Sequence, residues 1–153
     1  MPVYICDSSA IIKGYVQEIG SAYIENIIRN KDDTIVVAKI TKVEVVAALS
    51  RRFKNETSSQ RNIQHTIQLF LQHFDKRYYS ISVSSLLIDQ ATILARKYAL
   101  RGYDAVQLAV AVHANLRYQR NTQESIIFVS ADNELNHAAI QEGLSVENPN
   151  NYS

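Results

Sequence analysis

Short apolar runs alternate along the chain with longer segments in which apolar residues recur every three or four positions. The short runs are rich in Val, Ile and aromatic residues, which predicts β-strands. The strands are expected at residues 3–6, 34–38, 78–83 and 125–129, with a candidate edge strand at 144–146 after Gly143. Each run is too short for a helix of ordinary length, so the assignment follows from length as well as composition.

The longer segments have the period of amphipathic helices. They cover residues 8–29, 41–53, 61–75, 84–100, 104–118 and 133–142. The polar segment 55–60 is expected to join two antiparallel helices, so that residues 1–153 form a single domain. Strands that alternate with helices predict an α/β fold, with a central, mostly parallel sheet covered by helices on both faces.

Composition excludes several classes of protein. The chain has 153 residues, of which 46% are hydrophobic and 20% charged, as expected for one globular domain. No apolar stretch approaches the ~20 residues of a membrane span, and the first residues lack the pattern of a signal peptide. Cys6 is the single cysteine and has no partner for an internal disulfide. We therefore expect a cytoplasmic protein without a membrane partner.

Four carboxylates lie where a predicted strand gives way to a helix: Asp7, Glu44, Asp104 and Asp132. The carboxyl ends of parallel strands line one edge of a sheet, where ligands bind. Four acids at one edge would repel one another and raise one another's pKa values. Hard oxygen ligands without Cys or His partners favour Mg²⁺ or Mn²⁺. This pattern predicts a divalent metal site.

Each acid also has a structural interpretation, because helix N-termini favour acidic side chains. Thr41 and Glu44 match a capping box, and Asp104 with Gln107 has the same form. Asp7 and Asp132 are candidate N-caps. The residues alone leave both interpretations open, although the shared position of all four acids favours a metal site.

The chain resembles the PIN-domain ribonucleases, and among them the toxin subunits of VapBC-type toxin–antitoxin pairs. The first matching piece is a strand that ends in Asp and is followed by Ser, and another is an Asp-Ala-x-x-Leu-Ala helix start. Order and spacing match across nearly the whole chain. The matching pieces are residues 4–10, 41–44, 103–109 and 129–132.

This resemblance implies a PIN-like three-layer sandwich and a Mg²⁺- or Mn²⁺-dependent endoribonuclease. It implies that the four acids are catalytic and bind the metal, and that Ser8 and Ser130 orient them through hydrogen bonds. Lys39 departs from the family, which usually has smaller residues there. The expected partners are an RNA substrate, a small antitoxin protein and a second copy of the chain. The helix over 8–29 is apolar on more than one face, which we interpret as an interface.

Two other functions remain open. A phosphoryl-transfer domain would use Asp7 as a nucleophile, but such domains need a second Asp nearby or a Lys after a late strand, and no Lys follows Lys97. A non-catalytic module would use the acids only as caps and its helices to bind a protein. No glycine-rich phosphate-binding motif is present, which argues against a P-loop or dinucleotide enzyme. The four histidines show no zinc-site spacing.

Overall fold

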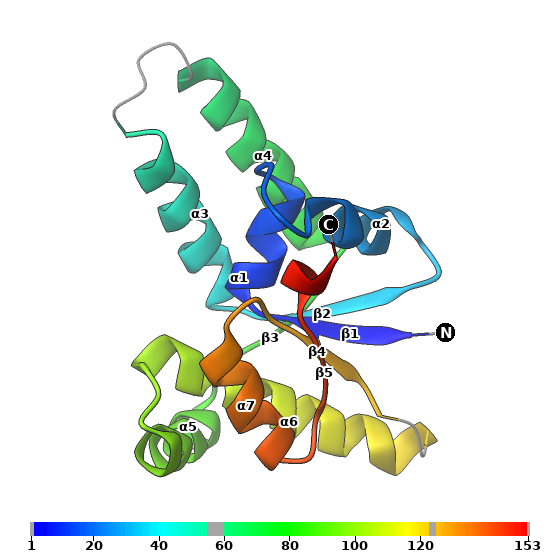
Figure 1. The fold of residues 1–153 in the computed structure, drawn as a ribbon, viewed down its shortest axis with the longest axis vertical. Helices are drawn as coiled ribbons and strands as arrows, with labels where there is room; N and C mark the ends of the chain where they lie inside the picture. Colours follow the sequence, from blue (N-terminus) through cyan, green and yellow to red (C-terminus); the bar gives the residue numbers. More distant parts are fainter. Residues whose placement is uncertain (1, 55–59, 123–124, 153) are drawn as a thin grey trace.

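The computed structural model describes residues 2–54, 60–122 and 125–152, which form an α/β fold around a five-stranded sheet (Figure 1). All strand pairs in the sheet are parallel, and the strand order is β3-β2-β1-β4-β5. In the central register, Tyr4 of β1 pairs with Ile35 of β2 and with Ile127 of β4. The predicted fold class is therefore confirmed. The strands are β1 (Val3–Cys6), β2 (Thr34–Ala38), β3 (Tyr79–Ile81), β4 (Ile127–Val129) and β5 (Ser145–Glu147).

Helices cover both faces of this sheet (Figure 1). The first face carries the N-terminal helices and the second carries the C-terminal ones. On the first face lie α1 (Ser8–Ile11), the 3-10 helix η1 (Ile12–Gly14), α2 (Ser21–Arg29), α3 (Thr41–Arg52) and α4 (Gln60–Lys76). On the second lie α5 (Ser85–Tyr98), α6 (Gly102–Thr122) and α7 (Asn133–Gln141). A short 3-10 helix, η3 (Pro149–Asn151), follows β5 and packs against α2.

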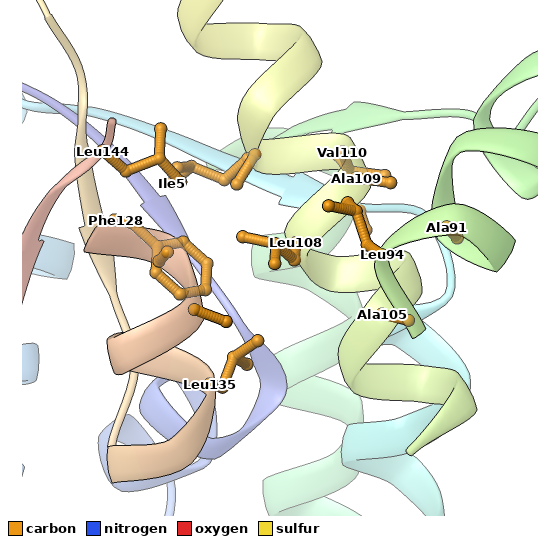
Figure 2. Close-up of a cluster of buried hydrophobic side chains, with 14 of the residues drawn as sticks. Ile5, Ala91, Leu94, Ala105, Leu108, Ala109, Val110, Phe128, Leu135 and Leu144 are labelled. Carbon is orange, nitrogen blue, oxygen red and sulfur yellow. The ribbon is translucent and has the colours of Figure 1, made fainter. Parts of the chain in front are cut away.

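The central strands are apolar on both faces because each face is buried by helices. Successive residues of β1 point to opposite sides, so Ile5 joins the cluster under α5–α7 while Cys6 joins the cluster under α1–α4. Figure 2 shows the first of these clusters, in which Leu108 of α6 points toward Phe128 of β4 and Leu135 of α7. All three side chains are fully buried. This packing holds α6 and α7 against the sheet. It thereby also holds the first turn of each helix at the edge of the sheet.

The single helix predicted over residues 8–29 is wrong. The segment forms α1, η1 and α2, with residues 15–20 between them outside any α-helix. Gly20 has φ of 88°, a left-handed backbone that interrupts the helix before α2. The buried Lys13 donates a hydrogen bond of 2.8 Å from Nζ to the carbonyl of Ile19, which stabilises the break.

The break also changes how we interpret the apolar excess of residues 8–29, that is, the apolar residues beyond a single helix face that predicted an interface. Ile11, Ile24 and Ile27 are buried in the core, whereas Ile19 is strongly exposed. Most of the excess therefore belongs to the core of this chain, so the segment itself gives little support to the interface predicted for it.

The remaining boundaries agree with the predictions to within a few residues, and the largest difference is in α6. This helix begins at Gly102 and continues to Thr122, beyond both predicted ends. The predicted joint at 55–60 lies largely outside the described residues, but α3 and α4 do pack side by side and extend away from the sheet (Figure 1). No helix in the described ranges is long and apolar enough to cross a membrane.

Candidate active site

Asp7 is a buried carboxylate at the carboxyl end of β1. Its Oδ1 accepts hydrogen bonds from the backbone N of Ala10 at 3.0 Å and from Ser9 Oγ at 2.7 Å. Its Oδ2 accepts one from Ser130 Oγ at 2.6 Å. The pKa of Asp7 is raised to about 6, mainly by burial and to a smaller extent by the nearby charge of Asp104, while these hydrogen bonds oppose the rise. Asp7 is thus held in place as an acid that ionises with difficulty.

Glu44 projects from the first turn of α3 and does not cap that helix. The residue at the N-cap is Ile40, which makes no side-chain capping bond, so the capping box predicted for Thr41 and Glu44 is wrong. Glu44 Oε2 instead accepts from Ser8 Oγ at 3.1 Å, and Oε1 accepts from Gln107 Nε2 at 2.8 Å. Burial raises its pKa despite these bonds, and the charge of Asp104 adds to the effect.

Gln107 connects α6 to α3. Besides Glu44, its Nε2 donates to Thr41 Oγ1 at 2.9 Å, and both Gln107 and Thr41 are buried. The second predicted capping pair, Asp104 with Gln107, therefore does not form, because Gln107 turns toward the other helix. A buried amide that bonds two partners fixes the position of Glu44 relative to α6.

Asp104 lies in the first turn of α6 and is half-buried. Burial is the largest cause that raises its pKa, and the charges of Asp132 and Glu134 add to it, while Arg101 opposes them. The charge of Asp104 also raises the pKa values of Asp7 and Glu44. Asp104 therefore lies within electrostatic reach of all three other predicted acids.

Asp132 follows β4 and caps α7. Its Oδ1 accepts from the backbone N of Leu135 at 3.0 Å, as the N-cap prediction requires. Its own backbone N donates to Ser130 Oγ at 3.1 Å. The fully buried Ser130 therefore bonds both Asp7 and Asp132, and it joins the ends of β1 and β4.

The structure also identifies residues that sequence reasoning missed. Ser9 bonds Asp7 and accepts a hydrogen bond of 3.0 Å from the backbone N of Ala131. The sequence could have indicated this role, because Ser9 lies two residues after the Asp that ends a strand. At that position the first helical turn brings the hydroxyl back to the carboxylate. Glu134 lies on the first turn of α7, close enough to Asp104 to influence its pKa. In the sequence Glu134 lies inside a helical pattern rather than at a strand end, so it was not assigned to the site.

The four acids share one edge of the sheet without forming a preassembled ion site. Across residues 2–54, 60–122 and 125–152, no three His, Cys, Asp or Glu side chains are grouped closely enough to hold a metal ion by themselves. A pocket of about 420 Å³ opens between α1 and α3, lined by Ser8, Ser9, Glu44 and Tyr103 among others. Of the four acids, only Glu44 lines it.

Comparisons with solved structures find the same fold in proteins of low sequence identity. PAE2754 from Pyrobaculum aerophilum matches with a TM-score of 0.68 and 15% identity, over 98% of this chain and 91% of that one. The structure of VapBC2 from Rickettsia felis bound to a DNA fragment from its promoter matches with a TM-score of 0.63 and 16% identity. The match covers 95% of this chain and 98% of that one. A toxin–antitoxin complex from Klebsiella pneumoniae matches with a TM-score of 0.62 and 16% identity, over 95% and 97%.

At the level of sequence, a comparison with curated proteins found no match. The family model for the PIN domain matches residues 4–141, a range that begins in β1 and ends at the last residue of α7. That range includes all four acids and every strand except β5. The chain therefore belongs to the PIN domain family.

Proposed function

We propose that this chain is a divalent-metal-dependent endoribonuclease, with Asp7, Glu44, Asp104 and Asp132 as its metal-binding and catalytic residues. The observation that carries the proposal is the way hydrogen bonds bring these acids together: Ser130 bonds both Asp7 and Asp132, while Ser8, the residue after Asp7, bonds Glu44. Burial is the largest cause of the raised pKa values of Asp7, Glu44 and Asp104, and the charge of a neighbouring acid adds to each of them. A site that only capped helices would not need to bring these charges together.

The donor set fits a hard cation. All four ligands are carboxylates, which suits Mg²⁺ or Mn²⁺ better than a softer metal. Because the described acids do not form a closed cage, water and substrate phosphate would complete the coordination, as is usual for Mg²⁺. A bound ion would supply Lewis-acid stabilisation of the negative charge that develops on a phosphodiester during hydrolysis.

The chain's own residues would hold the acids in position for this chemistry. Ser9 and Ser130 fix the two oxygens of Asp7, while Ser8 and Gln107 fix those of Glu44. These hydrogen bonds orient the carboxylates before any ligand arrives, which lowers the cost of ordering them.

The alternative with Asp7 as a phosphoryl-accepting nucleophile fits less well. Asp7 is only 3% exposed. Both of its oxygens accept hydrogen bonds from within the protein. Oδ2 accepts one hydrogen bond and keeps a second lone pair for a metal ion, whereas the Lys that a phosphoryl-transfer site needs after a late strand is missing, since no Lys follows Lys97. The non-catalytic alternative is favoured by the two N-caps at Asp7 and Asp132, but it leaves Glu44 and Asp104 unexplained.

Cleavage of RNA tests the proposal. Purified protein should cleave single-stranded RNA in Mg²⁺ or Mn²⁺, and EDTA should abolish cleavage. Asp7→Asn keeps the shape of the side chain but removes its charge, so this variant should fold and lose activity. Retained activity in Asp7→Asn would contradict the metal role, and loss of fold would assign Asp7 a structural role.

We further propose that the chain is the toxin of a type II toxin–antitoxin pair and forms a homodimer. The support for the toxin role is the similarity in fold to VapBC2 and to a protein described as a toxin–antitoxin complex. An antitoxin segment with an Arg or Lys would be attracted to the acidic edge and would compete with the metal. Co-expression with the product of the neighbouring small gene should give a complex with suppressed cleavage. If the chain is monomeric at micromolar concentration and that product does not bind, the toxin assignment fails, while the nuclease assignment stands.

A further inference from the structure

Tyr103 presents an exposed aromatic ring beside the proposed catalytic acids. It precedes Asp104 in the first turn of α6 and is 63% exposed. It lines the same 420 Å³ pocket as Glu44, Ser8 and Ser9. Large aromatic side chains are usually buried, and one that is exposed in a pocket next to charged groups is typical of binding sites.

Helix α3 forms one wall of this pocket, through Val43 and Val45 and through a stripe of four other residues. Glu44, Ala47, Ala48 and Arg51 are spaced at i, i+3, i+4 and i+7, so they share one face of the helix. Arg51 lies about 10 Å along the helix axis from Glu44, at a rise of 1.5 Å per residue. The stripe thus carries a carboxylate at one end, a guanidinium at the other and small side chains between.

Arg51 differs from its neighbour in its contacts. Arg52 donates to Glu18 at 3.1 Å, whereas Arg51 forms no ion pair with the described residues. Arg51 is exposed and lines the pocket. An arginine with a free guanidinium binds a phosphate through two parallel hydrogen bonds.

We propose that this pocket binds an unpaired segment of RNA next to the scissile phosphate, with one base stacked on Tyr103 and a neighbouring phosphate bound by Arg51. The inference rests on the proposed nuclease function and adds the substrate contacts to it. Aromatic rings bind unpaired bases of any sequence by stacking, which is the usual way that proteins hold single strands. The guanidinium favours a polyanion in the pocket over an uncharged peptide.

Steady-state cleavage of a short fluorogenic RNA in Mn²⁺ tests the proposal. Tyr103→Ala should raise KM about 5- to 100-fold, with kcat nearly unchanged, and Tyr103→Phe should restore the KM of the wild type. Arg51→Ala should also raise KM and weaken its dependence on salt. The matched controls are Tyr79→Ala, since Tyr79 is 66% exposed on β3 outside the pocket, and Arg96→Ala on α5. Both controls should behave as the wild type.

An RNA substrate that lacks one base shows whether the Tyr103 ring acts by stacking on that base or only by supporting the structure of the pocket. Removal of the stacked base should weaken the wild type but have no further effect on Tyr103→Ala. If Tyr103→Ala keeps the KM of the wild type, the inference is overturned. If Tyr103→Ala keeps that KM but binds a co-expressed antitoxin more weakly, the pocket binds a peptide rather than RNA. Absence of any metal-dependent cleavage by the wild type would overturn the proposed function itself, so the two failures are distinguishable.

Discussion

Asp7 combines deep burial with a negative charge. It is only 3% exposed, and its pKa is raised from 3.8 to about 6. A carboxyl with a higher pKa in the folded state than in the unfolded state binds its proton more tightly when folded. The stability that it contributes is therefore fully present below about pH 4 and is lost as the pH rises through about 6.

This behaviour gives a prediction for the metal-free protein. Between pH 4 and pH 7 in EDTA, the free energy of unfolding of the wild type should fall relative to that of Asp7→Asn by about 2 kcal/mol. Urea denaturation of both proteins across this range measures the difference, since contributions from other groups cancel. Parallel pH profiles would show that Asp7 ionises normally and that its burial has no energetic cost.

Individual residues also show how far sequence reasoning reaches. The caps at Asp7 and Asp132 were predictable because an N-cap depends only on neighbouring residues. The role of Glu44 was not, because its partners Ser8 and Gln107 lie 36 and 63 residues away. Local spacing favoured a capping box, whereas hydrogen bonds from Ser8 and from Gln107 of α6 provide different partners for the same carboxylate.

At the scale of elements, the strands were predicted well and the first helix was not. Buried parallel strands carry an unbroken apolar run, and that signal is local. The break between α1 and α2 depends on Gly20, whose left-handed backbone lies against Pro149 of η3 at the other end of the chain. Periodicity continues through the break, so the pattern alone could not reveal it.

The contact at Gly20 leads to a second prediction. A Cβ at Gly20 would collide with the carbonyl oxygen of Pro149, and the residue also has φ of 88°. Gly143 has nearly the same φ, 89°, with open space around a Cβ. Gly143→Ala should cost about 1–2 kcal/mol of stability from backbone strain, and Gly20→Ala about 1–3 kcal/mol more from overpacking.

Urea denaturation of the two glycine variants measures both costs. The difference between them isolates the packing of α2 against η3 from the strain that the two sites share. Equal losses would mean that η3 moves aside freely, and that the C-terminal segment does not constrain the break before α2.

At the scale of the whole molecule, the fold collects acids from four distant segments at one edge of the sheet. If they bind metal, Mn²⁺ should stabilise the protein by relieving their repulsion. An ion at about 100 times its Kd contributes ~2.7 kcal/mol, which corresponds to a rise in Tm of about 5–10 °C for a chain of this size.

Thermal melting in Mn²⁺ and in EDTA measures this effect. Asp104→Asn should lose most of the rise, because Asp104 interacts with the other three acids. Asp89→Asn is the matched control, since Asp89 is an exposed acid on α5. A rise that is the same in all three proteins would indicate weak binding at scattered carboxylates rather than at this edge.

The most direct test of the account is the rate of RNA cleavage by Asp104→Asn at saturating Mn²⁺, measured beside the wild type and Asp89→Asn. Removal of the Asp104 charge should lower the rate at least ~100-fold, by analogy with the loss of one transition-state contact, while the protein still folds and its Tm in EDTA is not lowered. Asp89→Asn should cleave as fast as the wild type. Cleavage by Asp104→Asn at the rate of the wild type would contradict the claim that these acids form the active site.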